Sequence, residues 1–349
     1  MGSSFVLSSL IGIGCRVRMG ADTGGMCLIS TSLDLSRLPL QTIWHESVPL
    51  FKSFCSLGKE ELTFKDCHLL EEVFNFEWLN CNEDDATPFF PLQRLVLTNL
   101  SSLKSIWKNA PRGSPYFRHL KQLSISKCNR LKSIFAPSIA MCLVGLEKME
   151  ISVCLQSLCN LESFYFGSHV SICPSLKDLD MNTFASANSI GNSKVGKGVL
   201  FGEADQNHAE KLTRLSVLKL RQANQIEHLL EEDYYNDVIS GITNSVFQSL
   251  KTVKLSHCDR LKAPLFPCWL SLKNLTILSV DLELVSLPNL TSFCSVDQCT
   301  TNFDLPGLRN AVVAYCNELK FFCHGDVSAP KLRTVEMDYD YKALAREGL

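Results

Sequence analysis

The sequence has no excess of charge of either sign. Its 349 residues include 34 Lys and Arg against 36 Asp and Glu, which gives a formal net charge of −2 at pH 7. A protein that binds nucleic acid or an anionic membrane through its overall field carries a marked positive balance. We therefore expect recognition through local surfaces, with no nucleic-acid partner. No apolar run is long enough to predict a membrane span.

The strings that accompany common catalytic sites are also missing. The sequence contains neither a Gly-x-Ser-x-Gly elbow nor a His-Glu-x-x-His string. The stretch from Gly191 to Lys197 fits a phosphate-binding loop, but Gly198 stands where a Ser or Thr hydroxyl would bind magnesium. We therefore predict a non-enzymatic protein without a cofactor.

Cys and His are neighbours in three places, and this could suggest thiol catalysis. Residues next to each other on a strand point to opposite faces, so such a pair is a poor candidate for a catalytic dyad. The simpler interpretation is a buried Cys beside an exposed His. The three pairs are Cys67-His68, His257-Cys258 and Cys323-His324.

What the sequence does contain is a recurring template, Leu-x-x-apolar-x-apolar-x-x-Cys or Leu. Its clearest copy is Leu120, Leu123, Ile125 and Cys128. The alternation at Leu123 and Ile125 is that of a strand with one buried face, and the wider spacing that follows suits a turn or a helical return. One such unit cannot bury both of its apolar edges, so neighbouring units must stack. The copies begin at Leu92, Leu120, Leu146, Leu176, Leu215, Leu250, Leu275, Leu308 and Leu332.

This template is that of a leucine-rich repeat. We predict an α/β solenoid, a curved horseshoe with a parallel sheet of short strands on its concave face and irregular or short helical returns on its convex face. Residues 1–30 are expected to be a poorly ordered N-terminal segment. Residues 31–349 are expected to form about nine to eleven units, with insertions at 185–211 and 231–245.

Several of the 16 cysteines occur at one position of the repeat, and no two form a Cys-x-x-Cys pair. Leu100 and Phe184 stand in other copies where Cys128 stands in its own. A position that accepts Cys, Leu or Phe is a packing position, where a free thiol behaves as a small buried hydrophobe. We expect reduced structural thiols in an intracellular protein and no metal site.

Function is expected on the concave sheet face, where residues flanking the two central apolar positions point outward. In the copy that begins at Leu275, the template places Ile277, Ser279 and Asp281 there. Mixed charges on this face suit a protein partner of complementary charge, while the alternative for each residue is ordinary hydrated surface. The candidate partner-binding residues are Arg94, Thr98, Gln122, Ser124, Lys148, Glu150, Asp178, Asp180, Lys219, Arg221, Lys254 and Ser256.

One phrase recurs almost word for word along the repeats. It reads Cys128-Asn129-Arg130-Leu131-Lys132, Cys258-Asp259-Arg260-Leu261-Lys262 and Cys316-Asn317-Glu318-Leu319-Lys320. Together with Phe or Pro shortly before the first Leu, as in Phe90-Pro91-Leu92, this phrase resembles the repeat region of plant coiled-coil, nucleotide-binding, leucine-rich-repeat disease resistance proteins (NLR proteins). The resemblance covers roughly residues 30–340.

The resemblance implies a role in plant innate immunity. In that family the repeats sense pathogen effectors or guarded host proteins and restrain a nucleotide-switch module N-terminal to them. No phosphate loop and no coiled-coil heptads precede the repeats here, so the switch and its ADP or ATP site are not carried over. The expected partner is a pathogen effector, a guarded host protein or the nucleotide-binding domain of a related receptor.

Two other classes of protein use similar repeats. The substrate-recruiting arm of a ubiquitin ligase would need a helical F-box before the repeats, and residues 1–30 are too rich in Gly and Ser to supply one. A secreted receptor would need a signal peptide, but Arg16 and Arg18 follow the apolar run from Phe5 to Gly14, where a signal peptide has its basic residues before the run. We expect a cytoplasmic protein, with a nuclear or membrane-peripheral location left open.

Overall fold

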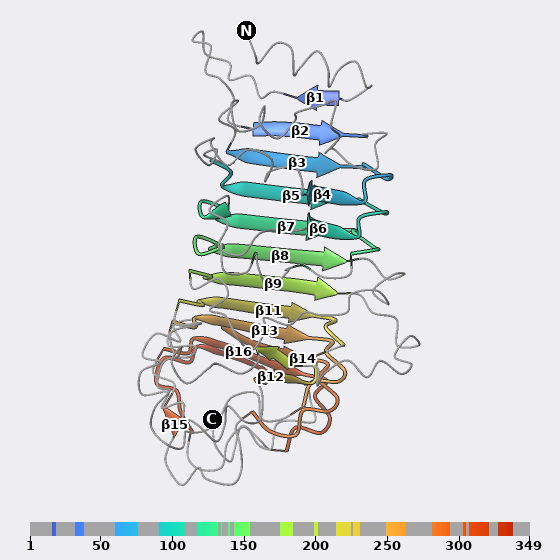
Figure 1. Cartoon of the computed structure of the whole chain (residues 1–349). Coiled ribbons are helices and arrows are strands. Elements are labelled where there is room, and N and C mark those ends of the chain that lie inside the picture. Colours follow the sequence, from blue (N-terminus) through green and yellow to red (C-terminus); the bar gives the residue numbers. More distant parts are fainter. Residues whose placement is uncertain are drawn as a thin grey trace. The chain divides into compact units, whose positions relative to one another are not determined.

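The computed structural model divides the chain into two compact units, Met1–Phe164 (unit 1) and Tyr165–Leu349 (unit 2), which we describe separately. Figure 1 labels strands of both units. The residues that the structure describes are 16–18, 32–37, 60–75, 91–108, 117–131, 134, 139, 143–153, 175–183, 199–201, 214–224, 226–230, 249–262, 281–293, 303–304, 307–320 and 327–337.

In unit 1 the repeats stack their strands into one main sheet. The strand order is β1-β2-β3-β5-β7-β8. Strand β1 pairs antiparallel with β2, and every later pair is parallel. The strands are β1 (Arg16–Arg18), β2 (Ser32–Ser36), β3 (Glu61–Lys65), β5 (Arg94–Thr98), β7 (Gln122–Ser126) and β8 (Lys148–Val153). On the return side of the repeats, β4 (Glu72–Asn75) pairs parallel with β6 (Ser105–Lys108).

Unit 2 follows the same plan. Its main sheet has the order β9-β11-β13-β14-β16-β18, with all pairs parallel. The strands are β9 (Asp178–Thr183), β11 (Val217–Arg221), β13 (Thr252–Ser256), β14 (Asp281–Val285), β16 (Asn310–Ala314) and β18 (Thr334–Met337). Two short parallel pairs join β10 (Val199–Phe201) to β12 (His228–Leu230), and β15 (Phe303–Asp304) to β17 (Val327–Ser328).

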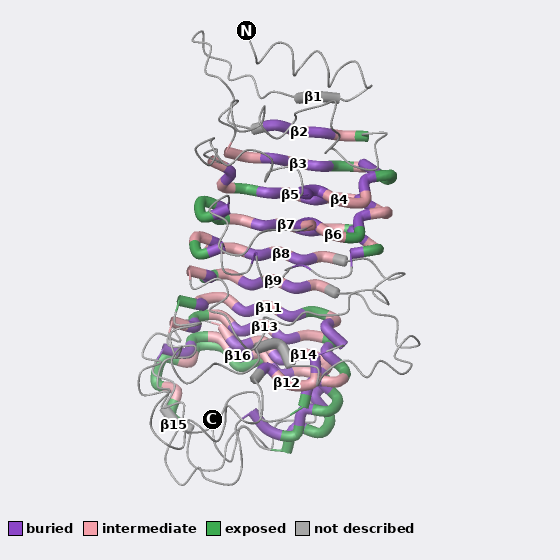
Figure 2. Tube along the Cα trace, viewed as in Figure 1, coloured by how far each residue is buried: buried purple, intermediate pink, exposed green. Residues whose placement is uncertain are grey.

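The alternating template explains why these strands form and stack. In β7, Leu123 and Ile125 point into the core, whereas Gln122, Ser124 and Ser126 are partly exposed. Across the ladder, Leu123 lies in register with Leu95 on one side and Met149 on the other. Each repeat thus buries its apolar edges against two neighbours, and Figure 2 shows this as buried strand centres. One parallel strand per repeat confirms the predicted leucine-rich-repeat solenoid.

One register prediction was wrong by four residues. The copy assigned to Leu275 would make Asp281 the last outward residue of its strand, but Asp281 begins β14 and pairs with Thr252 of β13. The buried pair in this repeat is Leu282 and Leu284. The segment offers two leucine series in different phases, and the one that stacks is the one whose alternating pair continues to Leu287 at the Cys position.

Several sequence predictions fall outside the described residues. Of the insertion predicted at 185–211, residues 199–201 are described, and they form β10. Three other predictions concern residues that the structure does not describe. They are the insertion at 231–245, the string from Gly191 to Gly198 that resembles a phosphate-binding loop, and Phe184 at the Cys position of its repeat.

A left-handed residue follows the main strand in most repeats. Its φ lies between 52° and 56°, although none of these residues is Gly: they are Arg37, Asp66, Asn99, Lys127, Gln222, His257, Ser286 and Tyr315. A non-Gly residue in this conformation costs about 1–2 kcal/mol. The turn directs the backbone N–H toward the next repeat, so that Asn99 donates to the carbonyl of Ser126, and Lys127 to that of Ser152, both at 2.9 Å. Each bond satisfies a donor that the turn would otherwise leave without a backbone partner.

Candidate protein-recognition surface

The outward side of each main sheet, which we call the rung face, carries the predicted partner-binding residues. They occupy the first, third and fifth positions of their strands, and all twelve are partly or fully exposed. Unit 1 holds Arg94, Thr98, Gln122, Ser124, Lys148 and Glu150, and unit 2 holds Asp178, Asp180, Lys219, Arg221, Lys254 and Ser256. The parallel register brings the members of each set side by side, because equivalent positions stack from strand to strand.

In unit 1 the charged candidate residues of the rung face, Arg94, Lys148 and Glu150, are held in ion pairs. The Arg94 guanidinium lies 3.1 Å from a carboxylate oxygen of Glu61 on the neighbouring strand, and Lys148 Nζ lies 2.6 Å from Glu150 on its own strand. Between them the hydroxyl of Ser126 donates to Thr98 Oγ1 at 3.1 Å. Such exposed pairs contribute little to stability, about 0–1 kcal/mol each, but they orient the side chains that a partner would meet.

In unit 2 the third positions of four neighbouring strands carry, in order, an acid, two bases and an acid. Asp180 lies opposite Lys219, which lies opposite Lys254, which lies opposite Glu283. Lys219 pairs with Asp180 at 3.3 Å and Lys254 with Glu283 at 2.9 Å. Hydrogen bonding to Glu283 raises the pKa of Lys254 above its ordinary value, despite the opposing effect of burial. Among the described residues, Arg221 has no carboxylate within ion-pair distance.

Sequence reasoning missed several residues of this surface. Glu61 could have been found, because Leu62 and Phe64 already carry the template. Glu283 was hidden by the register error at Leu275. Asp281 is the first residue of β14 and not the last of its strand, and its carboxylate accepts a hydrogen bond from Asn310 Nδ2 at 2.6 Å.

The Lys of one copy of the Cys-x-x-Leu-Lys phrase, Lys262, has a structural role on the return side. Lys262 Nζ lies 2.8 Å from Glu227, its counterpart in the preceding repeat, and the Lys262 N–H donates to the Glu227 carbonyl at 2.8 Å. The hydrogen bond from Lys262 lowers the pKa of Glu227, so the pair persists where an ordinary Glu would begin to protonate. Lys104 and Glu71 repeat the arrangement in unit 1, with 2.7 Å between their charged atoms.

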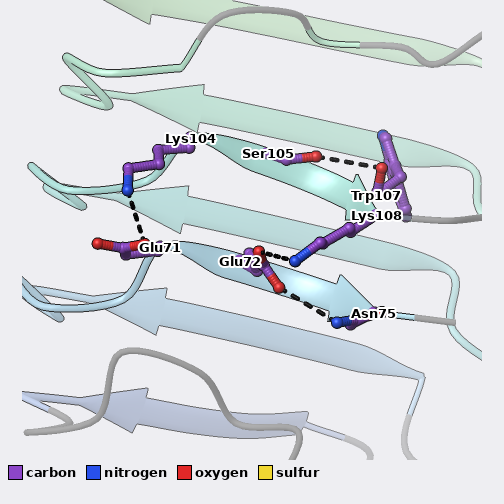
Figure 3. A network of polar contacts seen from close by, with 7 residues as sticks. All are labelled: Glu71, Glu72, Asn75, Lys104, Ser105, Trp107 and Lys108. Atoms are coloured by element: carbon purple, nitrogen blue, oxygen red, sulfur yellow. Dashed lines mark hydrogen bonds and ion pairs between the residues drawn. The ribbon is translucent and has the colours of Figure 1, made fainter. Parts of the chain in front are cut away.

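Figure 3 shows the unit 1 example within a wider polar network. Beside the Lys104 and Glu71 pair, Lys108 Nζ lies 2.7 Å from Glu72, whose other oxygen accepts from Asn75 Nδ2 at 3.3 Å. These contacts join β4 to β6 across two repeats. They hold neighbouring returns together and lie away from the rung face.

An aromatic cluster packs beneath the same strands. The rings of Phe74 and Trp107 stack with centroids 5.3 Å apart, and Phe117 meets both edge-on. Trp107 Nε1 donates to the carbonyl of Ile134 at 2.9 Å, so the one polar atom of the indole is satisfied. The cluster therefore anchors the returns of three successive repeats.

The repeat cysteines are buried and hydrogen-bonded, as a packing role predicts. The described ones are Cys67, Cys128, Cys258 and Cys316, all free thiols. Each Sγ lies 3.4 Å from the carbonyl two residues earlier, and 3.6–3.9 Å from a carbonyl of the preceding repeat. The thiol thus combines apolar packing with a weak donor that Leu lacks. In the described part of the chain, no cluster of His, Cys, Asp or Glu could hold a metal ion.

The thiols of Cys128 and Cys258 are expected to resist alkylation in the folded protein at about pH 8, because the thiolate is the reactive form. Burial raises the pKa of Cys128 to about 12 and that of Cys258 to about 11. Peptide mapping by mass spectrometry after iodoacetamide treatment would measure this, with the denatured protein as the matched control. Equal labelling of Cys128 before and after denaturation would contradict its buried, protonated state.

Comparison with known proteins bears directly on these repeats. Residues 58–155 match the family model described as plant disease resistance protein RPS2-like, leucine-rich repeats. This segment is similar to the leucine-rich repeats of RPS2-like plant disease resistance proteins. The match takes in 98 of the 349 residues, from just before β3 to just after β8. It confirms the resemblance that rests on the Cys-x-x-Leu-Lys phrase. No curated protein matches the chain.

The RPS2-like segment includes the six candidate residues of unit 1, from Arg94 to Glu150. Unit 2 repeats the same strand pattern, the same left-handed turn and the same buried thiol position beyond the matched residues. Within the described residues, no helix has the length and hydropathy that crossing a membrane requires.

Proposed function

We propose that the chain is a protein-recognition module of plant innate immunity. It binds a pathogen effector, a guarded host protein or the nucleotide-binding domain of a related receptor, and it acts by binding, without catalysis. The observation that carries the proposal is the rung face in an RPS2-like context: rows of oriented charges on a stacked parallel sheet. The RPS2-like match supports this class over the substrate-recruiting arm of a ubiquitin ligase.

The rung face suits a protein partner because its charges are mixed and regularly spaced. Neighbouring strands lie about 4.8 Å apart, so stacked side chains form rows with a fixed pattern of sign. In unit 2 that pattern is acid, base, base and acid, from Asp180 to Glu283. A partner with the complementary pattern gains specificity and association rate more than raw affinity. We place this recognition in the cytoplasm, because the reducing conditions there keep cysteine thiols free of disulfides.

Reversing Lys219 and Arg221 together to Glu is expected to leave the fold intact and to weaken partner binding about tenfold or more. Both side chains lie outside the core, while Leu218 and Leu220 beside them stay buried. Proximity labelling in leaf cells, with and without pathogen challenge, would identify partners, and binding of purified proteins would give the change in affinity.

The matched control reverses Arg214 and Lys251, which are exposed at the amino ends of β11 and β13, outside the rung face. Equal binding by the wild type, the rung variant and the control would remove this part of the rung face from the proposed site. If both variants lost partner binding equally, the loss would reflect the change in overall charge and not the loss of contacts at the rung face.

A further inference from the structure

A second surface in unit 1 concentrates positive charge at the carboxyl ends of the strands. Four exposed cations lie there: Arg37 after β2, Lys65 at the end of β3, Lys127 after β7 and Arg130 in the turn that follows. We call them the carboxyl-edge row. None of the four has an ion pair with another described residue. By contrast, four other cations of unit 1, Arg94, Lys104, Lys108 and Lys148, are each paired with a carboxylate at 2.6–3.1 Å.

The acidic residue of this edge does not offset the row. Asp66 follows Lys65 directly, and its carboxylate accepts a hydrogen bond from Asn99 Nδ2 at 2.6 Å. Among the described residues of this edge, four cations against one anion leave a local excess of positive charge, although the whole chain carries a net charge of −2. Segregated charge of this kind attracts an oppositely charged partner over about a Debye length of 8–10 Å.

The equivalent positions of unit 2 carry no such excess. There Arg221 and Arg260 share the edge with Asp259 and Glu318, and the Arg260 guanidinium is ion-paired with Glu227. The amino ends of the unit 1 strands are also balanced, since Arg118 and Lys121 share that edge with Glu60 and Glu147. The stacking of repeats does not itself produce a cationic edge, so the row in unit 1 is a local property of these sequences.

An apolar side chain lies within the same row. Leu69 is 52% exposed in the turn after Cys67, and it is one of few large hydrophobic residues with this much exposure among those described. Its turn stacks on the next one, where the Ser101 hydroxyl donates to the His68 carbonyl at 3.4 Å. Leu69 therefore belongs to the repeat between that of Arg37 and that of Lys127.

We infer that the carboxyl-edge row and Leu69 bind a short acidic protein segment that carries an apolar residue among its carboxylates. From Arg37 to Lys127 there are three strand steps, or about 14 Å, which an extended segment of about four or five residues can span. The described residues of this edge include no Phe, Tyr or Trp on which nucleic-acid bases could stack. Exposed Leu69 adds a contact that a simple phosphate polymer would not use.

Lys65 is the last outward residue of β3 and borders the rung face, but the other members of the row and Leu69 lie in the turns beyond the strands. The inference therefore goes beyond the proposed function and does not depend on it. The test uses the full chain and a labelled peptide that alternates Glu with Leu, with binding followed by fluorescence anisotropy. The double variant Lys127→Glu with Arg130→Glu is expected to weaken binding about tenfold. The variant Leu69→Ser is expected to weaken it severalfold.

The same strand provides a matched control. The double variant Arg118→Glu with Lys121→Glu makes the same charge change at the amino end of β7 and is expected to bind the peptide like the wild type. Thermal melting of all variants shows whether each is folded, and raising the salt concentration should weaken wild-type binding.

Two further probes distinguish other ligand classes. Polyphosphate and vesicles containing phosphatidylserine are expected to bind weakly and to be indifferent to Leu69→Ser. If either binds as tightly as the peptide, or if both double variants lose the peptide equally, the site for an acidic protein segment is overturned. Peptide binding that survives reversal of Lys127 and Arg130 in a folded protein overturns it as well.

Discussion

The substitution Leu123→Asp is expected to unfold the repeats of unit 1. Leu123 is fully buried, and it packs in register between Leu95 and Met149 of the two neighbouring repeats. A carboxylate there would lose its hydration without gaining a partner, at a cost of several kcal/mol on top of the lost apolar packing. Because a repeat is stabilised by its neighbours, the damage should extend to the strands on either side.

Circular dichroism melting and limited proteolysis would measure this loss. The matched control is Ser124→Asp, which places the same side chain one residue further along β7 on the exposed rung face. The control is expected to melt within a few degrees of the wild type, since surface substitutions usually change stability by less than about 0.5 kcal/mol. Similar melting of both variants would refute the register of the whole sheet.

The pH dependence of the Leu123→Asp variant gives a second, independent readout. Burial raises the pKa of a carboxyl group above its unfolded value, because the neutral form is preferred in the core. The destabilisation is therefore largest at pH values above the raised pKa of the folded state. It is progressively relieved as the pH falls through that pKa, and the relief is complete near pH 4, below which the unfolded chain binds the proton as well. The wild type lacks this buried group and should show no matching relief.

The substitution Gly145→Ala is expected to destabilise unit 1 by about 2–3 kcal/mol, an unusually large effect for one methyl group. A Cβ at this position would lie 2.4 Å from the carbonyl oxygen of Arg118 and 3.5 Å from that of Leu120. The obstacle is backbone of the neighbouring repeat, which cannot turn away as a side chain could. Two residues further along, the Glu147 N–H donates to the carbonyl of Lys121 at 2.8 Å, so the two backbone segments are held close together.

Chemical denaturation with urea would give the change in the free energy of unfolding. Val144→Ala is the control beside it, because Val144 is 43% exposed and loses little on truncation. If Gly145→Ala were as stable as this control, the close approach of the two repeats would be wrong.

The sequence could predict the strands and their inward faces because the information is periodic. Leu123 and Ile125 alternate within one strand, and the same pair returns in register in the next repeat, so the buried column follows from spacing alone. The prediction failed at Leu275, where the segment carries two overlapping leucine series. Choosing between them requires knowing which one stacks on Val253 and Leu255, and this depends on residues far away in the sequence.

The candidate surface was predictable in position but not in its electrostatics. Spacing placed Lys219 and Lys254 on the outward face, and both are there. Their partners Asp180 and Glu283 come from other repeats, 39 and 29 residues away. The left-handed turn left no trace in composition, because Asn99, Lys127 and Tyr315 have little in common beyond their place after the strand. Backbone geometry, and not residue type, defines that position.

The left-handed turns make the joints between repeats interchangeable. Seven of the eight described turns present their N–H to the main strand of the next repeat, as Asp66 does to Thr98 and His257 does to Val285. Because the coupling is made by main chain alone, it is indifferent to which side chains a repeat displays. A gene could therefore delete, duplicate or exchange whole repeats without leaving a main-chain donor unmatched. Outward residues are then free to diversify on a constant scaffold, which would suit the protein-recognition function proposed above.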